Sequence, residues 1–195
     1  MKPILVREEL LNRGIKIFTP LEFRRVFPKS QAQMQYFLET QAQQGLFIRL
    51  KKGLYALKTD LPGDEEIANA LYKPSYLSFE YAMAKYGIIP ESPYHLTSAT
   101  TNPTREFSIN HQAFSYYTIK QEAYTGYYLD TKGSRKILIA EPEKALADYL
   151  YFVSLGQRSF NDRFNVSKLD KVKLIEYAKL FERDKVIELV EQLPW

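Results

Sequence analysis

Cysteine is absent from this chain of 195 residues, and its absence excludes several kinds of chemistry. Without a thiol the protein forms neither disulfides nor thiolate nucleophiles, and zinc sites that need cysteine are excluded as well. No apolar run approaches the ~18 residues of a membrane span, and the first apolar stretch is broken at Arg7, Glu8 and Glu9. We therefore expect no membrane association and no secretory signal, and a cytoplasmic location fits this composition.

Recognisable catalytic motifs are also lacking. His95 and His111 are the only histidines, and no pattern brings them together beside a carboxylate. The chain contains no phosphate-binding loop, no Gly-x-Ser-x-Gly and no His-Glu-x-x-His. Residues 141–144 (EPEK) are superficially similar to a nuclease site, but proline stands where the acid-x-lysine spacing needs an acid. The sequence therefore predicts no enzyme, no catalytic residue, no metal and no cofactor.

Charge is distributed unevenly along the chain. Residues 1–60 hold 11 Lys and Arg against 5 Asp and Glu, whereas residues 61–195 hold 16 against 18. This asymmetry indicates a basic module followed by a nearly neutral one. A basic module attracts the phosphate backbone of nucleic acid, although solvated surface lysines would give the same count.

The first part of the chain predicts two short helices with a brief strand between them. The first helix is predicted from four apolar residues at helical spacing, Ile4, Leu5, Leu10 and Leu11. Gly14 can end this helix, and the apolar residues 15–18 suit a brief strand. Residues 19–22 (TPLE) have the pattern of a capping box with proline at the first helical position. They predict a second helix that runs to about Val26.

A third helix is predicted from Ser30, as its N-cap, to Gly45. One side of it would face the core with Met34, Phe37, Leu38 and Gln41. The opposite side carries Gln33, Tyr36, Thr40 and Gln43, with Gln31 and Gln35 beside it. An ordinary solvated helix surface carries mostly Glu and Lys, whereas this surface is rich in glutamine. Glutamine can read the edge of adenine bidentately in the major groove.

Two apolar runs follow, at 46–50 and 54–57, and they predict a β-hairpin with Lys51, Lys52 and Gly53 at its turn. Three helices and a basic hairpin predict a winged helix-turn-helix over residues 1–58, with the third helix in the major groove and the wing on phosphate. The candidate DNA-binding residues are Lys29, Ser30, Gln31, Gln33, Gln35, Tyr36, Arg49, Lys51 and Lys52. The alternative is a winged helix that contacts only proteins.

A second domain is predicted over residues 64–195, after a linker at 59–63 that contains proline and glycine. It would hold a helix at 64–71, a helix at 78–86 capped by Ser78, and a mostly antiparallel sheet. The strands are predicted at 95–101, 106–109, 113–120, 126–129 and 136–140, with a hairpin turn around 132–133. Further helices are predicted from 141 to about 155, at 169–181 and at 184–193. The predicted fold class is therefore α+β, with a mixed α/β domain after the winged helix.

Four segments resemble the AbiEi family of antitoxins from type IV (abortive infection) toxin–antitoxin systems, and they occur in the family's order. They are 45–57 (GLFIRLKKGLYAL), 76–90 (YLSFEYAMAKYGIIP), 99–101 (ATT) with 114–117 (FSYY), and 139–150 (IAEPEKALADYL). The resemblance covers nearly the whole chain.

The resemblance implies a bacterial phage-defence protein with two activities. The winged helix would bind double-stranded operator DNA at inverted repeats and repress its own operon, and the second domain would counteract a nucleotidyltransferase-type toxin, directly or indirectly. For Glu143, Lys144 and Asp148, helix capping and packing explain the motif without a functional site. Two other readings stay open: a protein-interaction module without DNA binding, and an enzyme whose residues the sequence does not reveal.

Overall fold

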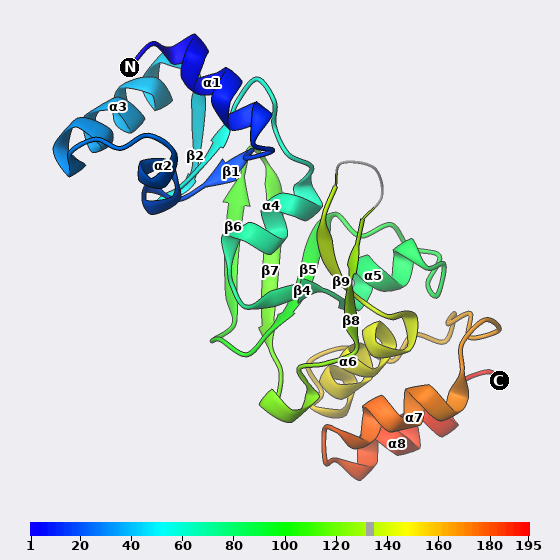
Figure 1. The fold of residues 1–195 in the computed structure, drawn as a ribbon. Coiled ribbons are helices and arrows are strands. Elements are labelled where there is room, and N and C mark those ends of the chain that lie inside the picture. Colours follow the sequence, from blue (N-terminus) through cyan, green and yellow to red (C-terminus); the bar gives the residue numbers. More distant parts are fainter. Residues whose placement is uncertain (132–134) are drawn as a thin grey trace. The chain divides into compact units, whose positions relative to one another are not determined.

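The computed structural model describes residues 1–131 and 135–195 and has an α+β architecture (Figure 1). The chain divides into two compact units, the N-terminal unit Met1–Leu71 and the C-terminal unit Tyr72–Trp195. The helix at 64–71 thus groups with the N-terminal unit, whereas the sequence placed it in the second domain. None of the helices within the described ranges combines the length and the apolar character needed to cross a membrane.

The N-terminal unit contains four helices and a small antiparallel sheet. In chain order its elements are α1 (Pro3–Asn12), β1 (Ile17–Phe18), α2 (Pro20–Val26), α3 (Gln31–Gln44), β2 (Phe47–Lys51), β3 (Leu54–Leu57) and α4 (Asp64–Leu71). The strand order is β1-β3-β2, so the hairpin strand β3 lies between its partner and the short β1. Figure 1 shows α1, α2 and α3 gathered around this sheet.

The predicted caps of α2 and α3 are present. The Thr19 hydroxyl accepts a hydrogen bond from the Glu22 backbone N–H (3.3 Å), and the Glu22 carboxylate accepts one from the Thr19 backbone N–H (2.7 Å). The Ser30 hydroxyl accepts from the Gln33 N–H (3.3 Å) at the start of α3. Gly45 ends α3 with φ +87°, a conformation that glycine adopts without steric cost. Short-range sequence signals therefore set the limits of both helices.

The helix α1 is present as predicted, but the four apolar residues that indicated it do not all pack into the core. Leu10 is buried, and its neighbour in the core is Val6, one turn earlier. Ile4 and Leu5 are 56% and 57% exposed. Apolar residues lie all around α1, so their spacing cannot tell which stripe packs inward. The core is instead set by rings from other elements that contact one another, such as Phe18 and Phe47 with centroids 5.1 Å apart.

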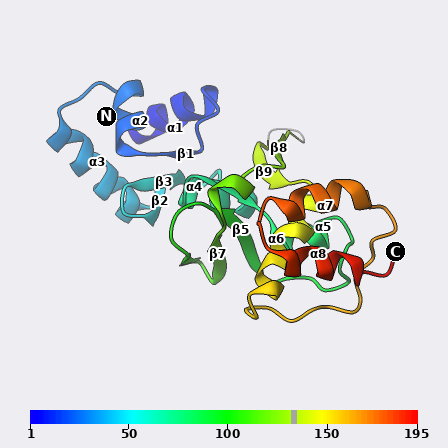
Figure 2. The same cartoon turned by 90° about the horizontal axis from the view of Figure 1, so that it is seen from below.

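The C-terminal unit is built on a six-stranded sheet. Its elements are β4 (Ser75–Leu77), α5 (Phe79–Lys85), β5 (His95–Thr100), β6 (Arg105–Ile109), β7 (Gln112–Thr118), the 3-10 turn η1 (Gln121–Ala123), β8 (Tyr127–Asp130), β9 (Ile137–Ala140), α6 (Pro142–Ser154), α7 (Lys171–Lys179) and α8 (Asp184–Glu191). The helices α6, α7 and α8 contact one another and form a group, as Figure 2 shows. Phe79 of α5 and Phe152 of α6 both contact Tyr117 of β7, so these two helices cover the same face of the sheet.

The sheet is mixed, with the strand order β6-β7-β5-β4-β9-β8. The pairs β4–β5, β6–β7 and β8–β9 are antiparallel, whereas β4–β9 and β5–β7 are parallel. The strand β4 was not predicted, although it lies at the centre of the sheet. The predicted hairpin turn around 132–133 lies outside the described residues.

Candidate nucleic-acid interface

The helix α3 presents a long polar surface to solvent. Met34, Phe37, Leu38 and Gln41 are buried on one side, as the sequence predicted. The exposed residues are Gln31, Ala32, Gln33, Gln35, Tyr36, Glu39, Gln43 and Gln44. Tyr36 is 73% exposed, which is high for a large ring. The predicted glutamine surface therefore exists on α3, and its side chains are accessible along more than three helical turns.

Three exposed cations precede this surface. Arg24 and Arg25 lie in the last turn of α2, and Lys29 lies in the loop that leads into α3. Within the described ranges none of the three forms an ion pair, so their charges are not neutralised by the unit itself. The two arginines were not among the predicted interface residues. Their adjacency at the end of a helix that precedes a glutamine-rich one was a signal available in the sequence.

The hairpin β2–β3 contributes fewer free cations than its sequence suggests. Arg49 and Lys52 are exposed, and Lys52 lies at the tip beside Gly53, whose φ is +76°. Lys51, however, is half-buried, and its ammonium group donates to the backbone carbonyl of Leu71 at the end of α4. In the predicted interface, Arg49 and Lys52 are therefore the cations of the hairpin that are most exposed to a ligand, and Lys51 is less so.

Two of the predicted α3 residues already have partners within the helix. The Ser30 hydroxyl caps the helix, which fixes its oxygen as an acceptor for backbone N–H. The Gln35 side-chain amide donates to the carboxylate of Glu39, one turn further along. Glu39 was not among the predicted residues, although it is the single acidic side chain of α3. The exposed surface is therefore not purely amide in character, because it includes one carboxylate.

Part of this exposed surface of α3 borders a groove with a volume of about 410 Å³. Lys29 lies at one end of it and Gln44 near the other, and Gln33, Tyr36 and Thr40 line it between them. Met1 and Phe37 also line it, so the groove combines polar side chains with apolar and aromatic ones.

A second polar cluster lies inside the C-terminal unit. Lys144 and Asp148 of α6 form an ion pair, and both side chains are fully buried. The Asp148 carboxylate also accepts hydrogen bonds from the hydroxyls of Ser78 (2.6 Å) and Tyr76 (3.1 Å). Burial raises the pKa of Asp148 and lowers that of Lys144, while the ion pair opposes both changes.

This buried cluster is structural. A catalytic group must touch substrate, and neither Lys144 nor Asp148 has exposed side-chain surface. The cluster joins α6 to β4 and to the first residue before α5. It also corrects the predicted role of Ser78, which stands at the N-cap position but donates its hydroxyl to Asp148. Glu143 is buried as well, and its carboxylate accepts from the Asp170 backbone N–H (3.1 Å).

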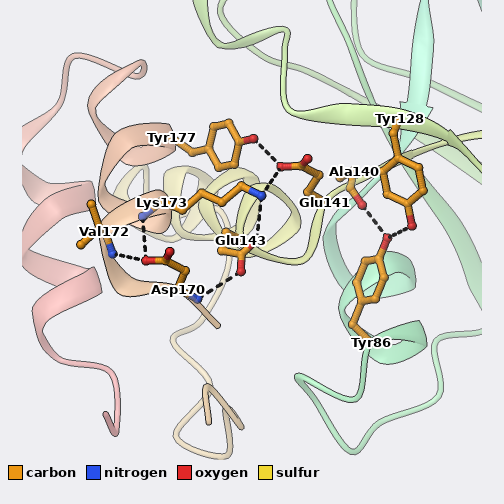
Figure 3. A network of polar contacts seen from close by, with 9 residues as sticks. All are labelled: Tyr86, Tyr128, Ala140, Glu141, Glu143, Asp170, Val172, Lys173 and Tyr177. Atoms are coloured by element: carbon orange, nitrogen blue, oxygen red, sulfur yellow. Dashed lines mark hydrogen bonds and ion pairs between the residues drawn. The ribbon is translucent and has the colours of Figure 1, made fainter. Parts of the chain in front are cut away.

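A surface network holds α7 against the start of α6 (Figure 3). The Lys173 ammonium lies 2.8 Å from the Glu141 carboxylate and 3.7 Å from that of Glu143. The Tyr177 hydroxyl donates to Glu141 (2.5 Å). Burial alone would raise the pKa of Glu141, but Lys173 and Tyr177 hold it below its ordinary value. Nearby, the hydroxyl of Tyr86, which directly follows α5, donates to the Ala140 carbonyl of β9 (2.7 Å).

The two histidines lie in separate places in the C-terminal unit. His95 begins β5, and His111 lies in the two-residue turn between β6 and β7. Asn110 and His111 both have positive φ (48° and 68°), as a type I′ turn requires. Among residues 1–131 and 135–195, no group of three or more His, Cys, Asp or Glu is placed to hold a metal ion.

No family model matches the chain, and no curated protein matches it either.

Proposed function

We propose that the N-terminal unit is a winged helix that binds double-stranded DNA. One observation carries this proposal: the exposed glutamine-rich surface of α3 is flanked by cations without ion-pair partners in the described residues. Unneutralised Arg and Lys side chains attract phosphate, and exposed amides can read base edges. A surface made only for solubility would not need both features in one place.

In this proposal the contacts divide by chemistry. Gln31 and Gln33, in the first turn of α3, read bases in the major groove, because recognition helices use their N-terminal residues there. Lys29, Arg49 and Lys52 bind phosphate, which adds affinity without sequence information. Ser30 acts mainly by capping α3.

Salt-dependent binding of the full chain to its own upstream DNA tests this proposal. Replacing both Arg49 and Lys52 with alanine should weaken binding to every duplex and reduce the slope of log K against log salt by ~1 for each lost phosphate contact. Lys168→Ala is the matched control, because Lys168 is an exposed lysine in the C-terminal unit. Equal binding by the double variant and the control, or no binding by the natural chain, would count against the proposal.

We further propose that the chain is an antitoxin similar to the AbiEi family, which represses its own operon and counteracts a nucleotidyltransferase-type toxin. The four ordered segments of resemblance support this proposal. The test is co-expression with the product of a neighbouring nucleotidyltransferase gene: growth should be rescued by the full chain. Rescue by an Arg49→Ala/Lys52→Ala variant would separate the antitoxin activity from DNA binding. Failure of the natural chain to rescue growth would contradict the antitoxin proposal.

A second candidate is a protein-interaction module without DNA binding. The exposed Ile4 and Leu5 on α1 favour it, because such side chains commonly mark protein contacts. Binding to a partner that persists at high salt, is lost on replacing Ile4 and Leu5 with serine, and occurs without DNA affinity would establish this candidate instead.

A further inference from the structure

Glu39 is the least expected residue on the exposed surface of α3. It is fully in the solvent-facing part of the helix, and no Lys or Arg of the described chain forms an ion pair with it. A carboxylate at a DNA interface is repelled by phosphates. In the major groove a base that supplies a hydrogen-bond donor can offset this repulsion.

The partner of Glu39 within the protein is Gln35, whose amide group donates to one carboxylate oxygen. The second carboxylate oxygen of Glu39 remains an acceptor. Gln35 thus orients a group that can only accept hydrogen bonds, because an ionised carboxylate has no donor. Gln35 and Glu39 act together as one unit on the helix surface.

The position of Glu39 allows contact with a base. It lies eight residues after Gln31, which is about 12 Å along the helix axis. The major groove is wide enough to admit an α-helix, and a helix lying along it passes several base pairs over this distance, so Gln31 and Glu39 would face different base pairs.

The bases differ in what they offer to such a carboxylate. Cytosine presents its N4 amino group in the major groove as a donor. Adenine presents an N6 donor beside the N7 acceptor, which would repel the second carboxylate oxygen and suits the mixed donor and acceptor of a glutamine. Guanine and thymine present only acceptors as polar groups there.

We propose that Glu39, held in position by Gln35, is a specificity-determining residue that accepts a hydrogen bond from the N4 amino group of a cytosine in the major groove. This inference rests on the proposed DNA binding and states which base one residue of that interface recognises. Gln35 is a positioning residue for Glu39, which differs from the direct base contact predicted for it from the sequence.

The test is selection of bound duplexes from a pool with a randomised central segment, using the full chain. Glu39→Gln should change the preferred base at one position from cytosine to adenine, with about a tenfold loss of preference for cytosine. It should also raise affinity for random duplex, because a repulsive charge is removed. Gln35→Ala should keep cytosine at that position but weaken the preference.

Glu8→Gln is the matched control, because Glu8 is an exposed acid on α1 whose replacement makes the same change in net charge. It should leave the selected sequence unchanged. An unchanged preference in Glu39→Gln, with binding retained, overturns this inference alone. Failure of the natural chain to bind any duplex overturns the proposed function together with it, so the two failures are distinguishable.

Discussion

The helices α3 and α6 use their polar residues in opposite ways. In α3 most of the amides, Tyr36 and Glu39 point to solvent, and the buried side is apolar apart from Gln41. In α6 the charged residues Lys144 and Asp148 are buried, where they bind each other and hydroxyls from β4 and Ser78. Polar residues on a helix are thus available to a partner molecule only where the fold has not already used them.

The largest effect on stability is expected from Lys144→Met, which tests the buried side of this contrast. It leaves the Asp148 carboxylate buried without its cation, and we expect it to destabilise the C-terminal unit by about 3–5 kcal/mol. Trp195, the only tryptophan, lies in this unit, so its fluorescence during urea unfolding provides the measurement. The double variant Lys144→Met/Asp148→Asn should recover part of the loss, and a loss below about 1 kcal/mol in the single variant would contradict the structural role.

A smaller effect is expected from Ser30→Ala at the start of α3. Removing the cap of the Gln33 N–H should cost the N-terminal unit about 1 kcal/mol. Hydrogen exchange of the α3 amides measures this, and Gln43→Ala is the control because Gln43 is exposed and caps nothing. If both variants exchange alike, Ser30 does not act as the cap.

The smallest effect concerns the surface network of α7. The pKa of Glu141 is lower in the folded state than its ordinary value of 4.5, so the stabilisation is present above that pH and is lost as pH falls through the folded pKa. Lys173→Ala should remove this acid-dependent contribution by less than about 1 kcal/mol, because the pair is partly exposed. Unfolding of both proteins at pH 7 and pH 3 measures it, and their stabilities should converge at the lower pH.

The sequence predicted the elements that local chemistry determines. The caps at Thr19 and Ser30, the stop at Gly45 and the buried stripe of α3 follow from spacing within a few residues. Elements that depend on contacts between residues far apart in the sequence were harder to predict. The strand β4 has three residues and follows Pro74, so it carries no periodic signal, yet its neighbours β5 and β9 make it central.

The candidate site shows the same division. The exposure of Gln31, Gln33 and Tyr36 could be predicted from helical periodicity. The contact of Lys51 with the Leu71 carbonyl could not, because the two residues are brought together by the fold of the whole N-terminal unit. The burial of Lys144 and Asp148 was equally hidden, since charged residues at helical spacing ordinarily predict a solvated face.

The segment after the hairpin has a practical consequence for dissecting the chain. The Arg7 guanidinium of α1 donates two hydrogen bonds of 2.9 Å to the Asp60 carboxylate and a third, of 3.1 Å, to the Thr59 hydroxyl. A truncated protein that stops at Lys58, where the sequence placed the end of the winged helix, would lose every one of these acceptors. One that ends at Leu71 keeps them, together with the carbonyl that accepts the hydrogen bond from Lys51, and is the better starting point for testing the proposed DNA binding by this unit alone.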